Sequence, residues 1–124
     1  MSFFPQFPAS LNIAAATPVA GTALVNGTPS LLTWTAPNDG QQHYAVMIVT
    51  LNVTSGLTGG AIQYAYTNPQ GGAASGKQLI AGASGIGAAR GFDGVLVQAG
   101  TTVTISQTAA TGGAAVFNGA IIGA

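Results

Sequence analysis

The stretch Ser30–Val53, SLLTWTAPNDGQQHYAVMIVTLNV, limits the possible folds more than any other part of the chain. Two runs rich in β-branched and aromatic residues, Leu31–Thr35 and His43–Val53, flank the turn signal Asn38-Asp39-Gly40. In the second run, apolar residues occupy both alternating sets of positions. This is expected of a central strand buried on both sides, or of a strand with one face on a core and the other on a partner. We predict that the two runs form the central hairpin of a β-sandwich.

Further β-rich segments, separated by turns rich in Gly, Asn and Thr, extend this pattern along the chain. They are Val19–Val25, Ala61–Thr67, Lys77–Ala81, Gly94–Gln98, Thr101–Ser106 and Ala114–Ile122. The segments between them that we predict as turns or loops include Ser55–Gly60, Ala83–Gly91 and Thr108–Gly113. About eight short strands without a helix are typical of an all-β sandwich or barrel. We predict one antiparallel β-sandwich domain over residues 19–124.

Residues 1–18 have a different character and are predicted to form an extended N-terminal arm. Three prolines interrupt regular structure there: Pro5, Pro8 and Pro18. Three aromatic rings are concentrated in the same segment: Phe3, Phe4 and Phe7. The rings either fold back onto the domain's own core or anchor the arm in a neighbouring subunit, because an extended segment with proline loses little entropy on docking.

Charged side chains are almost absent, which bears on possible partners. Only 3% of the residues are charged, namely Lys77, Arg90, Asp39 and Asp93, whereas about 25% is usual. Either Ser, Thr, Asn and Gln keep the surface wetted, or copies of the chain or a partner cover much of it, and we favour the second explanation. Two basic residues are too few for nucleic-acid binding. The sequence also predicts no transmembrane helix and no signal peptide.

Groups able to do chemistry are equally scarce. His43 is the single histidine, there is no cysteine, and Asp39 and Asp93 are the only carboxylates. Asp39 lies four residues before His43 and could accept a hydrogen bond from it, while both aspartates precede glycine, as turn residues do. These groups are too few for a closed metal site, and no Gly-x-Ser-x-Gly elbow is present. We expect no catalytic residue, no metal and no cofactor, and an enzyme is the least favoured hypothesis.

Three segments resemble the jelly-roll modules of the C1q/TNF-like family. Thr33–Gly40, TWTAPNDG, followed by Tyr44-Ala45-Val46, resembles the "F-T-A-P-x-D-G-x-Y" hairpin of that family. Residues 95–105, VLVQAGTTVTI, are similar to its penultimate hairpin, and residues 116–122, VFNGAII, to its closing "F-x-G-x-L-I" strand. The resemblance implies a jelly roll that usually assembles as a homotrimer. Such modules also occur on bacteriophage virions, as capsid decoration (cement) proteins and as fibre or spike knobs.

The resemblance implies a structural virion protein of the decoration type, made in the host cytoplasm and located on the outer capsid surface. Its partners would be further copies of the chain in a homotrimer and the major capsid protein of a viral shell, with no nucleic acid and no membrane. The candidate interface residues are Phe3, Phe4, Phe7, Trp34, Tyr44, Tyr64 and Tyr66. The alternative is a phage tail or fibre knob that binds a receptor or glycan. The tryptophan and the three tyrosines would then be exposed stacking platforms, although we favour core and inter-sheet packing for these four.

Overall fold

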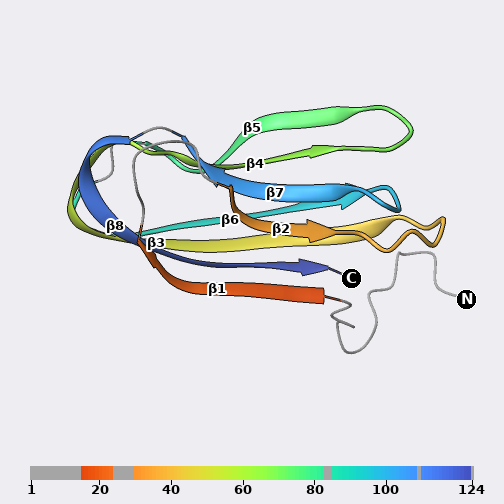
Figure 1. Cartoon of the computed structure of the whole chain (residues 1–124), viewed down its shortest axis with the longest axis horizontal. Coiled ribbons are helices and arrows are strands. Elements are labelled where there is room, and N and C mark those ends of the chain that lie inside the picture. Colours follow the sequence, from red (N-terminus) through yellow and green to blue (C-terminus); the bar gives the residue numbers. More distant parts are fainter. Residues whose placement is uncertain (1–14, 24–29, 83–84, 109, 124) are drawn as a thin grey trace, which may run out of the picture.

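Two antiparallel four-stranded sheets pack face to face in the computed structural model of the chain (Figure 1). The structure describes residues 15–23, 30–82, 85–108 and 110–123, and within these ranges there are eight strands and no helix. The strands are β1 (Ala15–Ala23), β2 (Ser30–Thr35), β3 (His43–Gly59), β4 (Ile62–Thr67), β5 (Ala73–Ile80), β6 (Gly87–Val97), β7 (Thr102–Gln107) and β8 (Ala110–Gly123). The prediction of an all-β sandwich is confirmed at this level.

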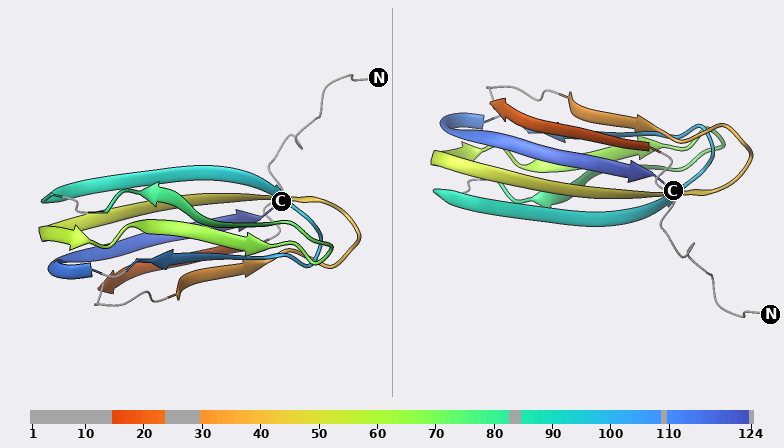
Figure 2. Two further views of the ribbon diagram at one scale, coloured as in Figure 1. Left: turned by 90° about the horizontal axis from the view of Figure 1, so that it is seen from above. Right: turned by 90° about the horizontal axis from the view of Figure 1, so that it is seen from below.

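The strand order follows a simple rule of pairing. One sheet, here called the β3 sheet, has the order β1-β8-β3-β6, and the other, the β4 sheet, has the order β2-β7-β4-β5. The first described strand pairs with the last, the second with the second last, and so on inward to β4 and β5. Two further pairings, β3 with β8 and β4 with β7, complete the sheets. The layers are seen from two further sides in Figure 2.

The predicted central hairpin is wrong, although both of its strands exist. β2 pairs with β7, whereas β3 pairs with β6 and β8, so residues 36–42 cross from one sheet to the other. The turn signal itself is real, because Gly40 has a φ of 75°, which favours glycine. A turn signal fixes where the chain reverses, but it does not fix which strand the next segment pairs with.

Alternation along β3 places one set of its side chains in the core. Ala45, Met47, Val49, Leu51 and Val53 are all buried and face the β4 sheet. Across the core they meet residues such as Trp34, Ile62, Tyr64, Val103 and Ile105, together with Phe117 and Ile121 of the neighbouring β8. Full burial of each large apolar side chain stabilises the fold by about 1.5–3 kcal/mol. The other set of β3 side chains, which begins at Tyr44, points outward.

Three predicted turns or loops belong largely to strands. β3 continues to Gly59 through the predicted turn at Ser55–Gly60, β6 begins at Gly87 inside the predicted loop Ala83–Gly91, and β8 begins at Ala110 inside the predicted loop Thr108–Gly113. The small residues there have a packing reason, because a Cβ atom on Gly91 would collide with the carbonyl oxygen of Leu79 on β5. Close approach of two backbones is thus what the glycine permits.

At the N-terminal side, the first strand begins at Ala15 rather than at the predicted Val19. Most of the predicted arm, including Phe3, Phe4 and Phe7, lies outside the described residues.

Candidate functional site

Of the tryptophan and three tyrosines among the candidate interface residues, two are buried in the core. Trp34 is 4% exposed and lies directly on the backbone of Gly123, where a Cβ atom would collide with the indole ring. Tyr64 is also 4% exposed and stacks on Tyr66, with ring centroids 6.5 Å apart. Neither Trp34 nor Tyr64 offers a free ring face to a ligand, in agreement with their interpretation as packing residues.

A hydrogen bond between Tyr64 and Asp93 joins the two sheets. The Tyr64 hydroxyl donates to Asp93 Oδ2 over 2.5 Å, and the backbone N–H of Gly94 donates to Oδ1 over 2.8 Å. Burial, reinforced by the hydrogen bond to the carboxylate and its negative charge, raises the pKa of Tyr64. Asp93 was predicted to be a turn residue and instead faces inward in the middle of β6. The bond fixes β6 to β4.

The outer face of the β3 sheet carries a continuous group of apolar side chains, here called the apolar face. In the register, Ile48 lies opposite Phe92 and Ala120, Val46 lies opposite Gly94 and Ile122, and Tyr44 lies opposite Leu96. Three members are exposed: Ile48 by 44%, Phe92 by 72% and Leu96 by 56%. A Cβ atom on Gly94 would lie 2.8 Å from the Tyr44 ring, so this glycine makes room for Tyr44 to lie across the face.

The outer face of the β4 sheet presents hydroxyl groups in the same kind of rows, and is here called the hydroxyl face. Thr35 and Thr67 lie on either side of Thr102, while Thr33 and Ala65 lie on either side of Thr104. The hydroxyls of Thr35 and Thr102 are hydrogen-bonded over 2.8 Å. Such a face is wetted without any charge.

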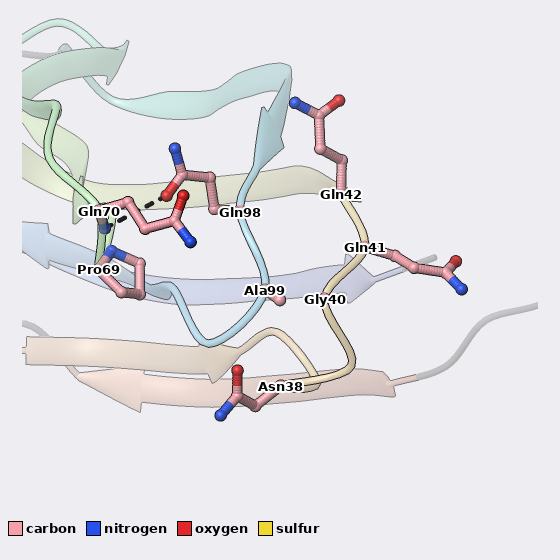
Figure 3. A pocket seen from close by; sticks show the side chains of 8 residues that line it. All are labelled: Asn38, Gly40, Gln41, Gln42, Pro69, Gln70, Gln98 and Ala99. Carbon is pink, nitrogen blue, oxygen red and sulfur yellow. Dashed lines mark hydrogen bonds between the residues drawn. The ribbon is translucent and has the colours of Figure 1, made fainter.

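A polar pocket of about 310 Å³ opens at one end of the sandwich. It is formed where three connections meet: β2–β3 (residues 36–42), β4–β5 (68–72) and β6–β7 (98–101) (Figure 3). Five side-chain amides line it, those of Asn38, Gln41, Gln42, Gln70 and Gln98. No charged side chain is among its lining residues.

The predicted hydrogen bond between Asp39 and His43 is confirmed beside this pocket. His43 Nε2 lies 2.8 Å from Asp39 Oδ1, and the same oxygen accepts from the backbone N–H of Gln41 over 3.0 Å. The hydrogen bond from His43, followed by that from Gln41, lowers the pKa of Asp39. His43 is buried and opens β3, so the pair braces the β2–β3 connection.

The sequence did not reveal two of these features. Phe92 was overlooked because the predicted strand began at Gly94, although alternation from Leu96 back to Phe92 was the available signal. The pocket amides come from connections far apart in the sequence, so no local pattern joins them.

Among the described residues, no three His, Cys, Asp or Glu side chains lie together as a metal site would need. Nor do these residues include a helix that could cross a bilayer.

Comparison with known proteins gives no family model that matches the chain, no similar curated protein and no similar solved structure. A function therefore has to be inferred from the two sheet faces and the pocket.

Proposed function

We propose that the protein is a structural component of a virion, a capsid decoration protein that assembles as a homotrimer and binds the outer surface of the shell. The observation that carries the proposal is the apolar face, on which Ile48, Phe92 and Leu96 are exposed close together. Exposed apolar patches of this kind mark interaction surfaces. In the trimer, the three apolar faces would meet around the threefold axis.

The energy available from such a contact suits a repeated assembly. Since Ile48, Phe92 and Leu96 are roughly half exposed in the single chain, covering them would contribute roughly 2–5 kcal/mol per subunit. This is modest for an isolated contact, but identical contacts repeated on a capsid lattice combine through avidity. Arg90, opposite Thr50, is the only charged residue that the described register places on this outer face.

In finer terms, we propose that the sandwich is a jelly roll. The orders β1-β8-β3-β6 and β2-β7-β4-β5 support this, because a jelly roll is one long hairpin of eight strands rolled into two four-stranded sheets. The family-like segments fall at the β2–β3 crossing, the β6–β7 connection and β8. Jelly rolls host many functions, so the fold supports the virion role only by analogy.

Self-association is tested by the mass of the full chain in solution, measured by light scattering after gel filtration. We expect about three chains per particle. Leu96→Lys on the apolar face should yield single chains, because the contact would bury an unpaired charge. Thr33→Lys, at an exposed strand position of the hydroxyl face, is the matched control and should leave the mass unchanged. A wild-type monomer, or equal effects of the two lysines, would contradict the proposal.

The virion role needs its own experiment. Particles purified from the virus that encodes the chain should contain it in a fixed ratio to the major capsid protein. Deleting residues 1–8 should abolish capsid binding and leave the trimer folded, because we assign the arm to the shell or the next subunit. If purified particles lack the chain, the decoration role is refuted. If the shortened chain binds as well as the full one, the arm has no such part.

A further inference from the structure

The pocket at the end of the sandwich is a second, independent feature. We propose that it binds an uncharged, hydroxyl-rich ligand, namely a sugar unit of a glycan. The inference goes beyond the assembly role, since it needs neither the trimer nor the capsid. It rests on the chemistry of the lining, on the side-chain groups left available and on the bracing of the three connections.

The lining suits a neutral polar ligand. A side-chain amide carries N–H donors and a carbonyl acceptor, and a sugar hydroxyl both donates and accepts. An anion would find no cation there, because Lys77 and Arg90 belong to β5 and β6 and are not part of the lining. A cation would find only Asp39 nearby, whose Oδ1 already accepts from His43 and Gln41.

Hydrogen-bonding groups remain available to a ligand on both flanks of the pocket. Gln70 and Gln98 lie on one flank, joined by a bond of 3.3 Å from the Gln70 backbone N–H to Gln98 Oε1 (Figure 3). Asn38 and Gln42 belong to the β2–β3 connection opposite, while Gln41 points away. Within the described part of the chain, the side-chain amides of Asn38, Gln42 and Gln70 have no hydrogen-bond partner. A ligand seated between the flanks would meet amides from three connections.

Hydrogen bonds between the connections hold the pocket open without a ligand. The N–H of Ala36 donates to the Thr101 carbonyl over 2.8 Å, and that of Gly100 donates to the Ala36 carbonyl over 3.2 Å. Asn68 Oδ1 accepts from the Thr101 hydroxyl over 3.0 Å and from the Gln98 N–H over 3.4 Å. All three connections are thus tied together, so binding would require little ordering of the chain.

The size and the lining also set the expected ligand and affinity. A volume of about 310 Å³ is near the lower limit of ligand pockets, roughly 300–1,000 Å³, and fits one sugar ring better than a long chain. Pro69 and Ala99 supply small apolar surface for the C–H groups of the ring. Because no aromatic ring is among the lining residues, we expect dissociation constants of about 1–10 mM for simple sugars.

The test uses the ¹⁵N-labelled full chain and three neutral probes: maltose, lactose and N,N′-diacetylchitobiose. Added up to about 20 mM, at least one should shift the side-chain NH₂ signals of Asn38, Gln70 and Gln98. Asn38→Ala combined with Gln70→Ala should weaken this binding roughly tenfold, because two donor–acceptor groups are lost. Gln78→Ala, an exposed glutamine of β5 outside the pocket, is the matched control and should have no effect.

A charged probe completes the test. Sialic acid should bind more weakly than the best neutral sugar, because no cation lines the pocket and the Asp39 carboxylate lies beside it. The proposal is overturned if no neutral probe shifts these signals, if a charged sugar binds as well, or if Gln78→Ala weakens binding as much as the pocket variant. The solution mass of the chain would be unaffected by any of these outcomes, so the assembly proposal stands or falls separately.

Discussion

The β3 sheet turns Ile48, Phe92 and Leu96 outward, whereas the β4 sheet turns outward rows of threonines that include Thr35 and Thr102. Both sheets share one core and have the same number of strands, so the difference lies in the outward positions alone. A chain with 3% charged residues can avoid aggregation in two ways: hydroxyl groups on its surface bind water, or a partner covers the surface. In the assembly proposed above, the β4 sheet would rely on hydroxyl groups and the β3 sheet on cover by a partner.

The largest expected effect comes from replacing a phenylalanine on each side of the β3 sheet, one in the core and one on the apolar face. Phe117 on β8 is fully buried, whereas Phe92 on β6 is 72% exposed. Phe117→Ala should lower the free energy of unfolding by about 3–5 kcal/mol, because it leaves a cavity. Phe92→Ala should change the unfolding of the single chain by no more than about 0.5 kcal/mol and weaken self-association instead. Urea unfolding at low protein concentration, combined with light scattering, measures both.

If Phe92→Ala destabilised the single chain as strongly as Phe117→Ala, Phe92 would be a core residue and the apolar face would not be an association surface. If it changed neither unfolding nor mass, the face would be exposed without a partner.

The next effect concerns the bond that fixes the two sheets to each other. Tyr64→Phe leaves Asp93 Oδ2 without its donor and should cost about 1–3 kcal/mol. The pKa of Tyr64 is raised above its usual value of 10.0. The hydrogen bond of its hydroxyl therefore contributes fully to the free energy of unfolding below pH 10, and this contribution is lost as the pH rises further. The wild type should therefore lose stability above pH 10 faster than Tyr64→Phe does. Asp93→Asn, which retains an acceptor, is the control and should lower the free energy of unfolding less than Tyr64→Phe does. If the stability of the wild type and of Tyr64→Phe fell equally above pH 10, the link between Tyr64 ionisation and stability would be refuted.

A smaller effect is expected on the hydroxyl face. Thr35→Val removes one partner of an exposed cross-strand hydrogen bond and should cost about 0.2–1 kcal/mol. Thr35→Val combined with Thr102→Val should cost less than the sum of the single changes, because no hydroxyl is left without its partner. Chemical denaturation of the four proteins gives the coupling. Should Thr35→Val alone raise the solution mass, the hydroxyl face would be an association surface too, and the contrast between the sheets would be lost.

The strands of both sheets could be predicted because alternation is a local property. His43–Val53 and Thr101–Ser106 were recognised in this way, and so was the local contact between Asp39 and His43. The pairing of the strands could not be predicted from the sequence, because β2 pairs with β7 and β3 pairs with β8 only when distant apolar faces are buried together. The glycine-rich start of β6 was mistaken for a loop, because a close approach to Leu79 has no signature in the local sequence.

The smallest effect concerns the loop end, which belongs to neither face. The pKa of Asp39 is lowered from its usual value of 3.8, so the contribution of its contacts is complete above about pH 4 and is lost as the pH falls through the lower folded-state pKa. The amide signal of Gln41, which donates to Asp39 Oδ1, should report this release, and Asp39→Asn should flatten its response. The solution mass should stay constant as the pH falls from 7 through the range below about pH 4 in which the Gln41 signal changes, because the association proposed for the apolar face depends on burial rather than on this carboxylate. A mass that changed together with the Gln41 signal would show that the loop end and the apolar face act as one surface, and the division of the molecule into separate regions would have to be abandoned.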